Sequence, residues 1–278
     1  MTTPSPPPRR PRWFVRRWVL FLTLLYAAVI VVFMWIENSL VFRPMPGSSW
    51  QKPIDPRTED VELVSADGTK LHAWWVPPTN PAAGALLYAH GNGGNLSYTG
   101  KTVAGLSKAT GAGVLAFEYP GYGKSEGKVS ERGCYAAGDA AYAWLTEKFP
   151  ANRVVIVGES LGGGVAVDLA ARHDHRALVL LCTFTTLPAA AKALFPFLPT
   201  HTFMRNRFDS LSKIKQCPRP LFMAHGTADR TVPYWQGEQL FAAANEPKEF
   251  LRLDGVEHAA VAGPVFYASL ASFLAKIP

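Results

Sequence analysis

The order of hydrophobic and polar positions divides the chain into an apolar N-terminal segment and a long mixed region. Residues 18–36 form a run of nineteen residues without a charge. A helix of that length spans about 28 Å at 1.5 Å per residue, close to the roughly 30 Å of a bilayer core. The pattern therefore predicts a transmembrane helix over residues 18–36 and a folded domain over residues 40–278.

Short apolar runs alternate with amphipathic stretches through the mixed region. Strands are expected over residues 61–64, 70–76, 84–89, 114–118, 154–157, 177–182, 220–224 and 249–253. Helices are expected over residues 98–110, 130–148, 161–172, 236–244 and 261–276. This alternation predicts the α/β class, with a mostly parallel eight-stranded sheet and helices on both faces. The first two strands meet at Asp67-Gly68, a typical hairpin turn, so that edge is expected to be antiparallel.

Positive charge gathers before the apolar run. The chain has 28 Lys and Arg against 21 Asp and Glu, a net charge of +7. Five of these charges come from Arg9, Arg10, Arg12, Arg16 and Arg17. The remaining +2 indicates no basic groove, so no nucleic-acid partner is expected. By the positive-inside rule, residues 1–17 form a cytoplasmic basic tail and the domain is exported, facing the periplasm if the source is bacterial.

A cleaved signal peptide is the alternative for the apolar run. Its apolar region would be about 7 to 15 residues long and would end at a small-x-small cleavage site. Residues 34–38 read Met-Trp-Ile-Glu-Asn and contain no such site. We therefore expect an uncleaved anchor in a single-pass membrane protein, with the lipid bilayer as its partner.

The segment Gly158-Glu159-Ser160-Leu161-Gly162 follows one of the predicted strands and precedes a predicted helix. A serine on such a tight strand-to-helix turn exposes its Oγ above the sheet, and small residues two positions before and after it relieve the crowding. The alternative is an ordinary glycine-rich turn. The flanking strand and helix favour a nucleophile elbow with Ser160 as nucleophile.

A nucleophilic serine needs a base, and the base needs a group that fixes its tautomer. His258 lies between the last predicted strand and the last predicted helix, so its ring should reach the carboxyl edge of the sheet. Asp229 directly follows the preceding strand and should reach the same edge. Asp254 and Glu257 are competing acids, but they share a short loop with His258. Asp229 is therefore the expected acid.

Two backbone N–H groups are the expected oxyanion donors. Leu161 follows the nucleophile and supplies the first. The glycine-rich turn over residues 90–95 follows the third predicted strand and supplies the second through Asn92, although a merely flexible turn is the simpler interpretation. Together with Ser160, His258 and Asp229, these two donors complete the predicted active site.

Other motifs do not indicate a cofactor or a metal. Residues 94–102 resemble a phosphate loop and residues 121–127 a dinucleotide turn, but both have their glycines in the wrong register. Cys134, Cys182 and Cys217 show no metal spacing and are expected to be small buried hydrophobes. If the domain faces an oxidising compartment, a disulfide between two of these cysteines is the alternative, and their spacing does not indicate which two.

Taken together, these motifs resemble the α/β-hydrolase superfamily, and more narrowly its N-terminally membrane-anchored abhydrolase-domain serine hydrolases. The motifs are residues 90–95, 119–127, 158–164, 225–229 with Val232-Pro233, and His258. The resemblance implies the α/β-hydrolase fold and an esterase, lysophospholipase or acyl-protein thioesterase activity. It also implies Ser160, Asp229 and His258 as catalytic residues, with Asn92 and Leu161 as oxyanion donors.

Residues 183–219 lie where this fold usually inserts a lid, and they are rich in Phe and Leu. Helices packed over the core and an acyl-chain groove are both compatible with that composition. The expected function is a membrane-anchored serine hydrolase that cleaves carboxylic esters or thioesters of small or lipid-like acyl substrates. An amidase or peptidase with the same triad and a non-catalytic binding protein are the alternatives.

Overall fold

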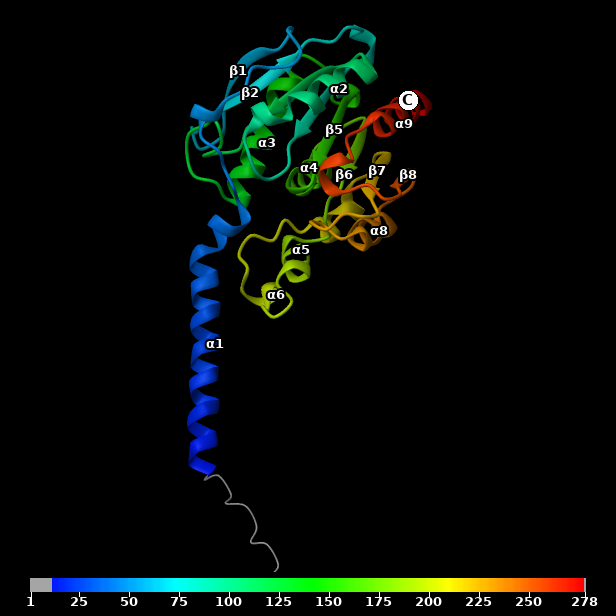
Figure 1. Cartoon of the computed structure of the whole chain (residues 1–278). Helices are drawn as coiled ribbons and strands as arrows, with labels where there is room; N and C mark the ends of the chain where they lie inside the picture. The colour runs from blue at the N-terminus through cyan, green and yellow to red at the C-terminus, as the bar shows by residue number, and fades with distance from the viewer. Residues whose placement is uncertain (1–11, 278) are drawn as a thin grey trace, which may run out of the picture.

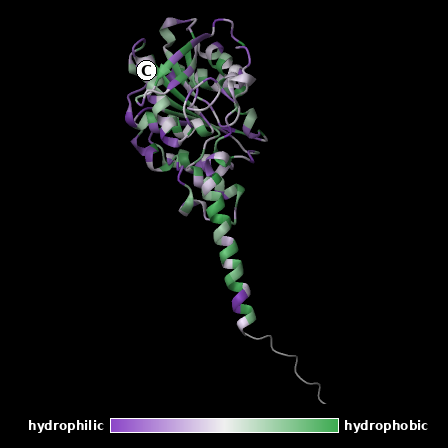
Figure 2. Cartoon of the chain, turned by 90° about the vertical axis from the view of Figure 1, so that its left-hand side faces the viewer, coloured by the Kyte–Doolittle hydropathy of each residue, from purple (hydrophilic) through white to green (hydrophobic). Residues whose placement is uncertain are grey.

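The structure is a computed structural model that describes residues 12–277. A long helix, α1 (Arg12–Val41), leads into an α/β domain (Figure 1). Most of the predicted basic tail therefore lies outside the described residues. Within the described chain, α1 is the one helix that is long and apolar enough to cross a membrane. Most of its residues are coloured as hydrophobic in Figure 2, and its large apolar side chains are exposed.

Helix α1 continues past the predicted end of the span at Ile36. The added turn contains Glu37 and Asn38, which make hydrogen bonds to the domain. These contacts explain why polar residues extend an otherwise apolar helix.

The sheet has eight strands in the order β1-β2-β4-β3-β5-β6-β7-β8. They are β1 (Glu59–Val64), β2 (Lys70–Val76), β3 (Ala85–Ala89), β4 (Gly113–Phe117), β5 (Val154–Glu159), β6 (Ala177–Leu181), β7 (Leu221–Gly226) and β8 (Lys248–Leu253). Strand β2 pairs antiparallel with β1 and β4, and the other pairings are parallel. The predicted eight-stranded, mostly parallel sheet with an antiparallel edge is confirmed.

Helices cover both faces of the sheet, as predicted. They are α2 (Gly100–Thr110), α3 (Glu131–Thr146), α4 (Leu161–Arg172), α8 (Tyr234–Ala243) and α9 (Pro264–Lys276). Helices α2 and α9 pack on one face, and α3, α4 and α8 pack on the other. Short 3-10 turns precede or follow several elements, including His258–Ala260 after β8.

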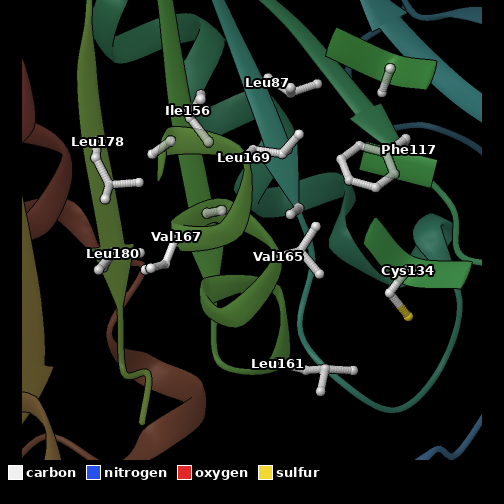
Figure 3. Packing of buried hydrophobic residues seen from close by; sticks show 14 of the residues in the cluster. Leu87, Phe117, Cys134, Ile156, Leu161, Val165, Val167, Leu169, Leu178 and Leu180 are labelled. Carbon is white, nitrogen blue, oxygen red and sulfur yellow. The ribbon is translucent and has the colours of Figure 1, made fainter. Parts of the chain in front are cut away.

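The central strands are apolar without interruption because side chains from both of their faces are buried. In β5, Ile156 packs into one core cluster, whereas Val155 and Val157 pack into the other. Figure 3 shows Leu87 and Ile156 near Leu169 of α4, with Val165 further along the same helix. This burial fixes the position of the carboxyl edge of the sheet.

The three cysteines are buried and unpaired. Cys134 packs in the core, and its neighbourhood is apolar. The expectation that the cysteines act as small buried hydrophobes is confirmed, and the disulfide left open by the sequence is not formed.

The lid-like insertion connects β6 to β7 and contains α5 (Leu187–Leu194), α6 (Thr200–Phe203) and α7 (Ser210–Lys213). Helices α5 and α6 lie below the sheet on the same side of the domain as α1 (Figure 1). Phe208 and Ile214 pack into the core, whereas Leu187 and Ala190 line a cavity. Part of this segment therefore packs over the core, as one interpretation predicted, while an acyl-chain groove along the cavity stays a prediction.

Candidate active site

Ser160 occupies the turn between β5 and α4 in a backbone conformation that L residues rarely adopt, with φ 52°. The turn is closely packed on both sides. A Cβ atom at Gly158 would lie 2.5 Å from the Cβ of Ala166, and one at Gly162 would lie 2.0 Å from the carbonyl oxygen of Ala89. Glycine is therefore required at both positions, and the turn holds Ser160 at the carboxyl edge of the sheet.

Three side chains from distant segments form a hydrogen-bonded chain at this edge. The Oγ of Ser160 donates to Nε2 of His258 at 3.0 Å. On the other side of the ring, Nδ1 of His258 donates to Oδ2 of Asp229 at 2.6 Å. The carboxylate thus selects the tautomer in which Nε2 is free to accept the serine proton.

The carboxylate of Asp229 is buried and held from several directions. Its Oδ1 accepts the backbone N–H groups of Thr231 and Val232, each at 2.8 Å. Nε2 of His225, in β7, lies 3.2 Å from Oδ2. Burial opposes ionisation of Asp229, but the hydrogen bonds from His225 and His258 outweigh it and lower its pKa. Asp229 is therefore an anion that can stabilise a positive charge on His258.

The competing acids lie elsewhere. Asp254 points to solvent, where its Oδ1 accepts a hydrogen bond from Nε of Arg252 at 2.7 Å. Glu257 is exposed on the turn before His258. Of the three acids, only Asp229 lies next to the imidazole of His258.

His225 is a contributor that the sequence analysis did not recognise. It is buried in β7, and its Nε2 donates to the carbonyl oxygen of Val232 at 2.9 Å while facing Asp229. The spacing of His225 and Asp229, four residues apart in one motif, was the available signal. His225 thereby fixes the loop that carries the acid.

Asn92 and Leu161, the predicted oxyanion donors, line the same cavity as Ser160 and His258. Leu161 opens α4, so its backbone N–H belongs to the first turn, which has no acceptor within the helix. The turn that carries Asn92 approaches Ser160 closely, because a Cβ at Gly91 would lie 3.4 Å from the serine Cβ. Their role as oxyanion donors stays a prediction.

A buried hydrogen bond between His90 and Glu118 supports the turn that carries Asn92. Nε2 of His90 lies 2.9 Å from Oε1 of Glu118, and both side chains are buried. The other carboxylate oxygen accepts the backbone N–H of Leu96 at 2.7 Å. Tyr119 donates its hydroxyl to the carbonyl oxygen of His90. These bonds fasten both ends of the turn to the end of β4.

The side chain of Asn92 joins this turn to the end of α1. Its Oδ1 accepts hydrogen bonds from the hydroxyl of Tyr122 at 2.7 Å and from the backbone N–H of Arg43 at 3.1 Å. Its Nδ2 donates to the carbonyl oxygen of Val41. The residues that follow the apolar helix are therefore built into the candidate site.

A cavity of about 550 Å³ opens at Ser160 and His258, and most of its lining is apolar. Helix α5 and the residues after it contribute Leu187, Ala190, Leu194 and Phe195. Helix α1 contributes Phe33, Leu40 and Val41. The apolar run of α1 predicts an anchor only, and nothing in its sequence pattern indicates this place in the cavity wall.

Glu37 docks the end of α1 onto the insertion. Its side chain is fully buried, and its Oε1 accepts the backbone N–H of Asn206 at 2.9 Å and the side-chain Nδ2 of the same residue at 2.8 Å. The backbone N–H of Arg205 also donates to this carboxylate, at 3.0 Å. The negative charge of the buried Glu37 carboxylate is thus stabilised by backbone and amide donors of the segment between α6 and α7.

Cys182 lies close enough to Asp229 and His258 for the three side chains to share a metal ion, with their ligand atoms within 4.8 Å of one another. Burial, together with the nearby charges of Glu159 and Asp229, raises the pKa of the Cys182 thiol well above its usual value. A metal would need the thiolate and would compete with the bond between His258 and Asp229. The donor set fits a hydrogen-bonded triad better than a metal centre.

Comparison with known proteins identifies the fold family. Residues 84–202 match the α/β-hydrolase fold family. The chain is 33% identical over 245 residues to the uncharacterized protein Rv2307c of Mycobacterium tuberculosis, covering 86% of this chain and 87% of that one. It is 31% identical over 193 residues to the alpha/beta hydrolase domain-containing protein 17B of Xenopus tropicalis, covering 69% and 66%.

The fold also superposes on the Pyrococcus furiosus esterase Pf2001 with a TM-score of 0.69 and 22% identity. The match covers 84% of this chain and 99% of the esterase. The protein belongs to the α/β-hydrolase superfamily, as the sequence motifs predicted, and its fold and relatives place it among the hydrolases.

Proposed function

We propose that the protein is a membrane-anchored serine hydrolase that cleaves carboxylic esters or thioesters of lipid-like acyl substrates. One observation carries the proposal: the hydrogen-bonded chain from Ser160 through His258 to Asp229 ends in a largely apolar cavity. A nucleophile, a base and an orienting acid in this order are what acyl transfer to serine requires.

In the proposed reaction, Oγ of Ser160 attacks the acyl carbonyl carbon while its proton passes to Nε2 of His258. The N–H groups of Asn92 and Leu161 stabilise the negative oxygen of the tetrahedral intermediate. The bond to the leaving alcohol or thiol then breaks, and Nε2 returns the proton to it. Water attacks the acyl-enzyme with His258 again as base, releasing the carboxylic acid and restoring Ser160.

The cavity supports the choice of substrate. Its apolar side chains offer a favourable environment for an acyl chain, because each buried methylene contributes about 0.8 kcal/mol. A polar or charged head group would find few partners on the walls formed by α5 and α1. An acyl chain along these walls would place its carbonyl carbon at Ser160.

We also propose that α1 stays attached as a transmembrane anchor, with the N-terminus cytoplasmic and the domain exported. The arginines before residue 18 support this orientation. A signal sequence shares the length and composition of α1, but cleavage would remove residues that the domain uses. Phe33 lines the cavity, and Glu37 is buried against the insertion.

Esters, thioesters and amides of graded acyl length test the proposal. With wild-type protein, we expect hydrolysis of esters or thioesters to rise with acyl length until the cavity is filled. Ser160→Ala should lower kcat by about 10³-fold or more, because the triad acts as a unit. Preferential cleavage of amides would favour the peptidase alternative, and a folded wild type no faster than Ser160→Ala would favour a binding protein.

A further inference from the structure

The loop after α5 lies beside the apolar helix α1. The hydroxyl of Tyr26 donates to the carbonyl oxygen of Phe197 at 2.9 Å, and the rings of Phe33 and Phe195 are 6.3 Å apart. Tyr26 precedes Ile36 by about 15 Å along the helix axis, at 1.5 Å per residue. The contacts with Tyr26 and Phe33 therefore place the loop alongside the half of the predicted span that is nearer the domain.

This loop exposes large apolar side chains. Leu194 is 53% exposed, Phe195 is 44% exposed and Phe197 is 86% exposed. Contact of these groups with water is unfavourable, whereas contact with hydrocarbon is not. The contacts of this loop with Tyr26 and Phe33 place these side chains next to the exposed apolar residues of α1, and Figure 1 shows the insertion on the same side of the domain as that helix.

The carbonyl groups of the loop have partners within the protein. Nζ of Lys192 donates to the carbonyl oxygens of Pro196 at 2.5 Å and Leu198 at 3.3 Å. The carbonyl oxygen of Phe195 accepts the N–H of Leu198, and that of Phe197 accepts the hydroxyl of Tyr26.

Water normally satisfies the carbonyls of a surface loop, but non-helical backbone inside a membrane must find protein partners instead. A cationic side chain such as that of Lys192 is tolerated inside a membrane when it pairs with backbone carbonyls. The bonded carbonyls of residues 195–198 and the exposed phenylalanines beside them together favour hydrocarbon as the medium around this loop.

The same loop forms part of the candidate active site. Leu194, Phe195 and Phe33 line the cavity that contains Ser160. Given the anchored serine hydrolase proposed above, on which the inference rests, we propose that residues 194–198 insert into the bilayer beside α1. The cavity then opens laterally to the membrane and receives the acyl chain of a membrane lipid directly, without its passage through water.

Insertion is measured with a fluorophore on Phe197→Cys in the full chain, reconstituted into phosphatidylcholine vesicles with brominated acyl chains. The three native cysteines are buried, so labelling is directed to the introduced residue. Val31→Cys on α1 is the positive control, since Val31 is 63% exposed on the helix. Val64→Cys is the negative control, since Val64 is 58% exposed on β1, away from α1 in Figure 1.

We expect bromine quenching at positions 197 and 31 and none at position 64. Quenching at position 31 but not at position 197 would overturn insertion of the loop. The absence of quenching at both positions would show that α1 is not in the membrane, and the anchoring proposal would fall together with the inference.

Lateral entry is tested with Phe197→Asp and its matched control Val64→Asp, using a soluble short-chain ester and a long-chain lysophospholipid held in vesicles. Phe197→Asp should slow hydrolysis of the vesicle substrate about tenfold or more while changing that of the soluble ester by less than about twofold. Equal effects on both substrates would contradict entry from the bilayer. Wild-type rates equal to those of Ser160→Ala would instead reject the hydrolase proposal, while the quenching result would still report on insertion.

Discussion

Replacement of Glu37 by glutamine tests whether the end of α1 is a working part of the hydrolase domain. The two carboxylate oxygens accept hydrogen bonds from Arg205 and Asn206, and no side chain other than a carboxylate offers two acceptors at this place. In Glu37→Gln, a carbonyl oxygen at the Oε1 position would keep its hydrogen bonds from Asn206 and from the backbone N–H of Arg205, but an NH₂ group would replace Oε2, which lies 3.1 Å from that same N–H. One acceptor is lost, and a donor opposes a donor.

The size of the effect follows from these bonds. The guanidinium of Arg205 is 66% exposed and 3.5 Å from the carboxylate, so it contributes little. Loss of the Oε2 acceptor, together with loss of the negative charge that strengthens the remaining bonds to Oε1, costs about 1.5 to 3 kcal/mol. For a protein of this size, that free energy lowers the Tm by about 3 to 12 °C.

Thermal unfolding in detergent micelles measures the stability of Glu37→Gln, with Glu238→Gln as a control at an exposed carboxylate on α8. Because Phe33 and Leu40 of the same helix line the cavity, hydrolysis of long-chain esters should also fall more than that of acetate esters. Equal Tm values for the two variants, with unchanged chain-length preference, would refute a structural role for Glu37.

Three further predictions concern the turn, the acid and the thiols. Asp229→Asn should lower kcat by roughly 10⁴-fold through loss of the correct His tautomer, whereas Asp254→Asn should keep nearly wild-type kcat; ester kinetics compare them, and the reverse order would identify the wrong acid. Gly162→Ala should abolish folded expression because its Cβ would lie 2.0 Å from a backbone oxygen, whereas Gly68→Ala, with open space around it, should cost only about 1 to 2 kcal/mol; circular dichroism and unfolding curves distinguish them. Burial raises the pKa of Cys217 to about 12, so iodoacetamide at pH 8 should modify this thiol only after unfolding, and rapid alkylation of the folded protein by mass spectrometry would contradict its burial.

The sequence predicted those features that leave a local pattern. Buried strands such as β3 and β5 are continuous apolar runs, and the order of Ser160, Asp229 and His258 follows from the chain order of a parallel sheet. Because each of these residues follows the carboxyl end of a parallel strand, their side chains were expected to meet at one edge of the sheet.

Contacts between distant segments were not predictable in this way. Glu37 bonds to Asn206 across 169 positions, and Asn92 bonds to Val41 across 51, so neither pair has a periodicity or spacing that reveals it. The expected boundary at residue 40 treated the helix and the domain as separable. The structure changes that expectation, because a fragment that starts there keeps Ser160 but loses Phe33 and Glu37 from the cavity wall and its support.

The central claim is that Ser160 is an activated nucleophile, and covalent labelling measures this most directly. The full chain in vesicles is treated with a fluorophosphonate, digested and analysed by mass spectrometry, with Ser160→Ala and His258→Ala treated in parallel. We predict one phosphonylated peptide, modified at Ser160, that is absent from Ser160→Ala and strongly reduced in His258→Ala because the base no longer removes the serine proton. An unmodified Ser160 in folded wild-type protein, or equal labelling of His258→Ala, would contradict the account.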